Sequence, residues 1–104
     1  MASIDLLPRD LDIVRKILDL HVPGIEVRAF GSRVAGNAGR HSDLDLILMT
    51  DSAVDLRILA RLNAALSDSS LPFTVDVLDW SSLEEPFRNL ILRSSVVVRD
   101  GGPR

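Results

Sequence analysis

The sequence predicts a small α/β domain, in which a β-sheet is assembled along the chain and helices pack on one face of it. Two observations lead to this class. The chain has 104 residues, 46% of them hydrophobic, which is the length of one domain with enough apolar material for a core. The spacing of apolar residues also changes along the chain, and it predicts elements in the order helix, strand, turn, strand, helix, strand, helix, strand. We therefore expect residues 1–104 to form a single domain.

The first helix and the first strand are predicted from two different apolar spacings. In residues 3–21, leucine and valine side chains recur at three- and four-residue steps, which places them on one side of a helix. Pro8 suits the first turn of this helix, and Pro23-Gly24 ends it. Residues 25–30 alternate between two faces, as expected of a strand.

The middle of the chain is predicted to contain a short helix, a loop, a strand and a long helix. Residues 32–36 favour a helical turn, and residues 37–42 form a loop by composition. Residues 43–50 predict a strand that is apolar on both sides except for two acids at its start. Residues 51–67 follow helical spacing, and a Ser-x-x-Asp sequence at positions 52–55 resembles a capping arrangement.

The last third of the chain is predicted to add two strands and a helix. Residues 73–78 form an apolar strand that contains one acid, Asp76. Residues 83–94 follow helical spacing, with overlapping Ser-x-x-Glu capping patterns before them. Pro86 is compatible with this helix because it falls close to the first turn. Residues 96–99 predict a short final strand.

Charge and composition exclude several classes of function. The chain has 12 basic and 15 acidic residues and a net charge of −3, so it lacks the basic excess of a nucleic-acid binder. It has no cysteine, which excludes disulfides and thiolate metal sites and fits a reducing cytoplasm. No apolar run approaches the length of a membrane span, and the N-terminus lacks a signal-peptide pattern. We expect a cytoplasmic protein that does not use nucleic acid as its main substrate.

One stretch carries most of the candidate chemistry, FGSRVAGNAGRHSDLD. Gly31-Ser32 follows an apolar run and can open a helix whose free N–H groups face an anion. Asp43 and Asp45 are two residues apart on a predicted strand, so their carboxylates point to the same face. Two acids at the start of an otherwise buried strand call for an explanation, because unpaired buried charge is costly. Because Mg²⁺ is usually shared between carboxylates and substrate phosphates, the stretch predicts a site for a metal-bound nucleoside triphosphate.

The spacing of this stretch resembles the signature of the DNA polymerase beta-type nucleotidyltransferase superfamily. The signature is Gly31-Ser32, ten intervening residues, and then Asp43-x-Asp45. The short chain is most similar to the minimal nucleotidyltransferase (MNT) branch, whose members are often antitoxin partners of HEPN-domain proteins. The likeness spans roughly residues 13–99. It implies a mixed sheet with the acids on the open face.

The resemblance also implies roles for individual residues. Asp43 and Asp45 would hold two Mg²⁺ ions, and Asp76 would help to hold the catalytic ion and orient the acceptor hydroxyl. ATP would be the substrate, with its triphosphate contacted by Gly31 and Ser32. A contact between Arg33 and the triphosphate is a further prediction.

Each of these assignments has a plainer alternative. Asp79 could be mistaken for the third ligand, but Asp76 is favoured because both of its neighbours are apolar and prone to form strands, whereas Asp79 leads into the next helix. A Gly-Ser pair can simply turn a corner. Arg33 could be an exposed arginine on a helical turn. Arg40 and His41 could meet phosphate or acceptor, or belong to a solvated loop.

The leading hypothesis is a protein nucleotidyltransferase that places AMP on a hydroxyl, expected to be a tyrosine, of a partner. In the MNT branch this partner is a HEPN-type toxin, which would be both the acceptor and the other member of a hetero-oligomer. The first alternative is a non-catalytic antitoxin that masks its partner. The second is a small-molecule transferase of the aminoglycoside-modifying kind, which usually needs an extra helical domain that a chain of 104 residues cannot supply.

Overall fold

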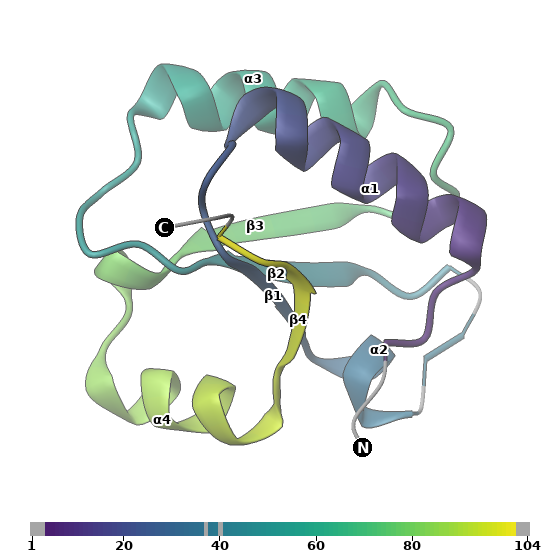
Figure 1. Ribbon diagram of the computed structural model, residues 1–104. Coiled ribbons are helices and arrows are strands. Elements are labelled where there is room, and N and C mark those ends of the chain that lie inside the picture. Colours follow the sequence, from purple (N-terminus) through teal and green to yellow (C-terminus); the bar gives the residue numbers. More distant parts are fainter. Residues whose placement is uncertain (1–3, 37, 40, 102–104) are drawn as a thin grey trace.

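The computed structural model describes residues 4–36, 38–39 and 41–101 (Figure 1). Within these residues, helices and strands follow each other in the order that the apolar spacing predicts. The elements are α1 (Pro8–His21), β1 (Val27–Phe30), α2 (Ser32–Ala35), β2 (Leu44–Leu48), α3 (Leu56–Ser67), β3 (Val75–Asp79), the 3₁₀ helix η1 (Trp80–Ser82), α4 (Glu85–Ser94) and β4 (Val96–Arg99).

The four strands form one mixed sheet in the order β3-β2-β1-β4. β1 is antiparallel to both of its neighbours, and β2 and β3 are parallel. The α/β class and the mixed sheet are therefore confirmed. A parallel pair needs a crossover connection, and α3 supplies it between β2 and β3. This crossover brings the start of β2 next to the start of β3, with Asp45 opposite Asp76.

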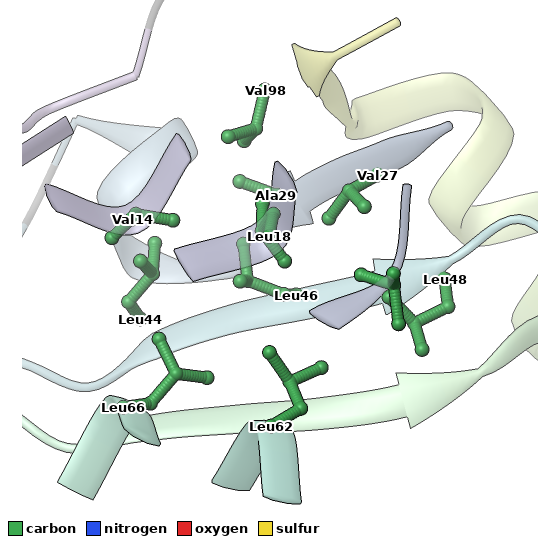
Figure 2. Packing of buried hydrophobic residues seen from close by; sticks show 11 residues of the cluster. Val14, Leu18, Val27, Ala29, Leu44, Leu46, Leu48, Leu62, Leu66 and Val98 are labelled. Carbon is green, nitrogen blue, oxygen red and sulfur yellow. The ribbon is translucent and has the colours of Figure 1, made fainter. Parts of the chain in front are cut away.

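The two long helices, α1 and α3, lie side by side over one face of the sheet (Figure 1). Alternate residues of the strands point toward them, because successive side chains in a strand face opposite ways. Figure 2 shows these side chains meeting between the helices and the sheet. The buried cluster consists of Val14, Leu18, Val22, Val27, Ala29, Leu44, Leu46, Leu48, Leu62, Leu66 and Val98.

The third long helix, α4, lies on the other side of the sheet from α1 and α3 (Figure 1). The prediction that helices pack on one face holds for the two longest helices but not for this one. Phe87 of α4 meets Phe30 of β1 edge to face, with ring centroids 5.8 Å apart. α4 covers part of this face, on which β1 and β2 also carry apolar side chains, among them the buried Ile47. The face that carries the acids is therefore only partly open.

Helix starts differ from the predicted ones where a side chain decides the boundary. α3 begins at Leu56, five residues later than predicted, because Asp55 is its N-cap and accepts a hydrogen bond from Arg57 N at 2.8 Å. α1 begins at Pro8, five residues later than the predicted start at residue 3, because proline favours the first turn of a helix. Across the described part of the chain, no helix is both long enough and apolar enough to cross a membrane.

Candidate active site

Asp45 and Asp76 stand next to each other on adjacent parallel strands, β2 and β3. They lie on the face opposite the main core, since their neighbours Leu46 and Val77 pack into the core. Asp43 comes just before β2 and is exposed. The pKa of the Asp45 carboxyl is raised above its ordinary value, first because burial disfavours the ionised form and then because Asp76 and Asp43 repel it. The structure thus brings the three predicted acids into one electrostatic cluster.

Gly31 is where the chain passes closest to this cluster. A Cβ atom added at Gly31 would lie 2.6 Å from Oδ2 of Asp45, so a side chain at this position would displace the Asp45 carboxylate. Gly31 also has a φ of 84°, which glycine adopts at little cost. The turn of α2 starts directly after it, with the N–H groups of Val34 and Ala35 bonded to the Gly31 carbonyl at 3.0 Å. Ser32, the first residue of α2, therefore begins its helical turn beside Asp45.

A hollow of about 690 Å³ lies along β3 and includes the acid pair. Its polar lining comes from Asp45, Asp76, Thr74, Asn63 and Ser67. Its apolar lining includes Phe30 on the face that carries the acids. β3 is at the edge of the sheet, so the hollow opens where no further strand flanks the acids. Asn63 and Thr74 are residues that the sequence analysis did not assign to the site, although a polar Asn63 within an apolar helical spacing is a usable signal.

Arg33 does not point into this hollow as a phosphate ligand would. Its side chain is only 6% exposed. The guanidinium donates to the backbone carbonyls of Ser42 at 2.9 Å and Asp5 at 2.8 Å, with a longer contact to Gly39 at 3.5 Å. It also lies over the ring of Phe73, 4.1 Å from the centroid. A triphosphate contact would break these interactions, so we replace the predicted role of Arg33 in nucleotide binding with one in holding the loop before Asp43.

Asp79 serves the fold instead of the acid cluster. Its carboxylate accepts hydrogen bonds from the Thr50 hydroxyl, from Val54 N at 2.7 Å, and from the backbone N and hydroxyl of Ser81 at 3.0 and 2.9 Å. Burial acts to raise the pKa of the Asp79 carboxyl, but these hydrogen bonds outweigh burial and hold the pKa below its ordinary value. The carboxylate also caps η1, which agrees with the prediction that Asp79 leads into the next helical segment.

The loop that precedes Asp43 contains Arg40 and His41, two candidates for contact with phosphate or acceptor. His41 is exposed, and its Nδ1 atom lies 3.0 Å from the Pro72 carbonyl oxygen, so it contacts the segment before β3. Arg40 lies outside the described residues. Within the loop, Ser42 N donates to Gly39 O at 3.2 Å and Gly39 N donates to Ser42 Oγ at 2.8 Å, which closes a small turn.

The acid cluster fits a divalent cation that is shared with a substrate. Among the described residues, no three His, Asp or Glu side chains gather closely enough to hold an ion by themselves. Mg²⁺ does not need such a cage, since it commonly takes one or two carboxylates and completes its shell with phosphate oxygens and water. Asp43, Asp45 and Asp76 offer hard oxygen ligands, and the pKa of Asp45 is raised by burial first and then by the negative charges of Asp76 and Asp43. The donor set is therefore that of an oxygen-ligated cation.

A mixed sheet with paired acids at its β2–β3 edge, next to a glycine-opened helical turn, defines a class of nucleotide-handling proteins. The chain belongs to the polymerase beta nucleotidyltransferase family, whose sequence pattern matches residues 9–101. A relative is the probable protein adenylyltransferase MntA of Haemophilus influenzae (strain ATCC 51907 / DSM 11121 / KW20 / Rd). The two are 42% identical over 99 residues, which are 95% of this chain and 87% of the relative. The family inferred from the Gly-Ser and Asp-x-Asp spacing is confirmed.

Solved structures share the fold at lower sequence identity. A crystal structure of a toxin–antitoxin with AMP-PNP matches with a TM-score of 0.72 at 22% identity, covering 86% of this chain and 73% of its own. A complex of tri-AMPylated Shewanella oneidensis HEPN toxin with MNT antitoxin matches with a TM-score of 0.66 at 18% identity, covering 88% and 71%. These likenesses establish the fold of the MNT branch for this chain.

Proposed function

We propose that this protein transfers AMP from ATP to a hydroxyl group of a partner protein, and that the partner is a HEPN-type toxin. The observation that carries the proposal is the placement of Asp45 beside Asp76 in adjacent strands, with Gly31 against the Asp45 carboxylate. The relationship to MntA, described as a probable protein adenylyltransferase, supports the reaction type. Toxin–antitoxin complexes among the solved structures of this fold support the kind of partner.

In the proposed reaction, the acceptor oxygen forms a bond to the α-phosphorus of ATP, the bond to the leaving pyrophosphate breaks, and the acceptor hydroxyl releases its proton to water. Bound Mg²⁺ supplies positive charge that neutralises the phosphates. Asp43 and Asp45 would be its principal ligands, and binding a cation there relieves the repulsion that raises the pKa of Asp45. Asp76, exposed at the edge strand, would accept a hydrogen bond from the acceptor hydroxyl and so orient it.

The triphosphate would lie against the turn that α2 begins. Ser32 is half-buried at the first position of this turn and can donate a hydrogen bond from its hydroxyl to a phosphate oxygen. Gly31 allows the phosphate chain to approach the backbone, because a side chain at this position would collide with Asp45. The hollow along β3 leaves the acids open at the edge of the sheet, which is where an acceptor side chain can enter.

A binding-only antitoxin is the second candidate, and one observation favours it. α4 exposes apolar side chains, with Phe87 38% and Leu90 52% exposed, and such residues could contact a partner without chemistry. Masking and catalysis make different demands on the acid cluster, because masking needs only the partner-facing surface. A cytoplasmic location remains our expectation from the absence of cysteine.

The test combines the wild-type protein with ATP, Mg²⁺ and the HEPN-type protein encoded by the adjacent gene, followed by intact mass measurement of that protein. We expect the mass to rise by one or more AMP groups. The double variant Asp43→Asn/Asp45→Asn should bind the partner but lower the rate of transfer by at least about a hundredfold, because charge stabilisation at the phosphates is lost. An unmodified partner whose toxicity is neutralised equally by both proteins would instead establish masking.

A further inference from the structure

Arg33 is a buried charge whose guanidinium donates to several backbone carbonyls. Taking a guanidinium out of water is costly unless its N–H groups find strong acceptors. Here Nε and two terminal nitrogens donate to the backbone carbonyls of Ser42, Asp5 and Gly39, and the planar group stacks on Phe73. Such an arrangement uses the fork geometry of arginine, which a lysine ammonium cannot reproduce. The cost of burying this charge implies that the contacts serve a purpose.

The carbonyls that Arg33 holds belong to the two ends of one turn. Ser42 N donates a hydrogen bond to the Gly39 carbonyl, and Gly39 N donates one to Ser42 Oγ. Arg33 donates to both of their carbonyls. Ser42 is bonded directly to Asp43, so its peptide group determines where Asp43 lies just before β2. On the other side, the Asp5 backbone N–H donates to the Arg33 carbonyl at 2.7 Å, which ties the segment before α1 to the same point.

We propose that Arg33 is a positioning residue that fixes Gly39 and Ser42 relative to each other and thereby sets the position of Asp43 relative to Asp45. Asp43 is the acid in need of such support, since it is exposed and precedes the first residue of β2. Asp45 and Asp76, in contrast, are placed by the sheet itself through their paired register. The inference rests on the proposed function only in taking Asp43 as a ligand of the metal–nucleotide complex.

The decisive variants are Arg33→Met, which removes the donors, and Arg33→Lys, which keeps one charged donor. Val98→Ala is the control for lost stability, because Val98 is 2% exposed and lies in β4, which pairs with β1. Arg57→Met is the control for lost positive charge, because Arg57 is exposed on α3 and pairs with Asp55. ATP binding is titrated with Mg²⁺ by calorimetry, and hydrogen exchange is followed at the amides of residues 41–43.

We expect Arg33→Met to raise the Mg²⁺ concentration needed for ATP binding by about tenfold or more, a size typical of losing a group that orients a metal ligand. Arg33→Lys should fall between wild type and Arg33→Met. Exchange at residues 41–43 should quicken in both variants and stay at the wild-type rate in both controls. If Arg33→Met does not fold, Phe73→Leu, which removes only the stacking ring, should show the same two changes at a smaller size.

Two other results separate this inference from the proposed function. If Arg33→Met loses stability as Val98→Ala does but keeps the wild-type Mg²⁺ dependence and exchange rates, Arg33 has no positioning role. If the wild-type protein binds ATP equally with and without Mg²⁺, the proposed function fails. The exchange experiment then decides by itself whether Arg33 holds the turn before Asp43.

Discussion

Asp76 and Asp79 are three residues apart in one strand and have opposite surroundings. Asp76 is exposed on the face that carries Asp45, where like charges gather and the pKa of Asp45 is raised. Asp79 pairs in register with Leu48, is 9% exposed, and receives hydrogen bonds from Thr50, Val54 and Ser81 that lower its pKa. Because side chains alternate along a strand, two residues that are an odd number of positions apart point to opposite faces. One acid therefore joins the site and the other holds the connection from β2 to α3.

This difference separates carboxylates that stabilise the fold from carboxylates kept for a ligand. A carboxylate surrounded by donors from its own chain lowers the free energy of the folded state. Carboxylates that crowd together raise it, and such an arrangement persists where a function needs it. The following experiments test the contrast, beginning with the largest expected effect.

Exchanging the two acids for amides should produce opposite phenotypes. We expect Asp76→Asn to lower the rate of AMP transfer by at least about a hundredfold while changing the unfolding free energy by less than about 0.5 kcal/mol. Asp79→Asn should lower the unfolding free energy by about 2 kcal/mol, because its amide N–H₂ would face the N–H groups of Val54 and Ser81. Transfer rates and thermal unfolding, measured on both variants, check this pair.

The pH dependence sharpens the result for Asp79. Its pKa is lower in the folded protein than the ordinary value of 3.8, so its stabilising contribution is complete above pH 3.8 and is lost as the pH falls through the folded-state pKa. The stability gap between wild type and Asp79→Asn should therefore be widest near neutral pH and shrink in acid. A stability difference between wild type and Asp79→Asn that is equal near neutral pH and in acid would contradict a stabilising role for Asp79. A transfer defect in Asp79→Asn below its melting temperature would contradict it as well.

Two glycines of positive φ provide a test of the close approach to Asp45. Gly36 has a ψ of 11°, in the left-handed region, where alanine costs about 1–2 kcal/mol; Gly31 has a ψ of −155°, in a region essentially restricted to glycine, so alanine is more strained there. Only at Gly31 would the new Cβ meet Asp45, at 2.6 Å; at Gly36 nothing lies within 4 Å. We expect a larger loss of stability in Gly31→Ala than in Gly36→Ala, and a loss of transfer, up to about a hundredfold, in Gly31→Ala alone. Equal transfer rates would show that Asp45 tolerates displacement.

The smallest effect expected is on the metal-free stability of Asp45→Asn. The folded-state pKa of Asp45 is above 3.8, so the folded protein binds this proton more tightly and ionisation lowers stability as the pH rises. The amide removes that cost, which should raise the melting temperature at pH 7 by no more than a few degrees, because partly exposed charges contribute less than about 1 kcal/mol. The gain should vanish below pH 3.8.

Adding ATP and Mg²⁺ should make the wild-type protein more stable than Asp45→Asn, the reverse of the order expected without metal. The wild-type protein gains stability from a ligand that binds only its folded form, whereas Asp45→Asn should not. Thermal unfolding in chelator and in ATP with Mg²⁺ provides both halves of this measurement. An Asn variant that is less stable than wild type in chelator would remove the argument that the acids repel one another.

Most of the architecture follows from apolar spacing along the chain. The alternation in β1 and β2 and the three- and four-residue steps in α1 are local patterns, and local patterns determine which elements form. Boundaries were less predictable: α3 starts after Asp55, because that side chain caps it, and the preceding residues are held by Asp79 from a distant strand. A bond across 25 residues leaves no trace in local spacing.

The sequence by itself determined the family, the element order and the acids Asp43 and Asp45, because their two-residue spacing and the strand period act locally. Only the tertiary structure decided the rest. It placed Asp76 beside Asp45 through strand register, buried Asp79 among donors, and turned Arg33 under the loop instead of toward a phosphate. It also put α4 across the sheet from α1 and α3. In each case the deciding contacts join segments far apart in the chain, and a contact of that kind is set by packing and not by sequence spacing.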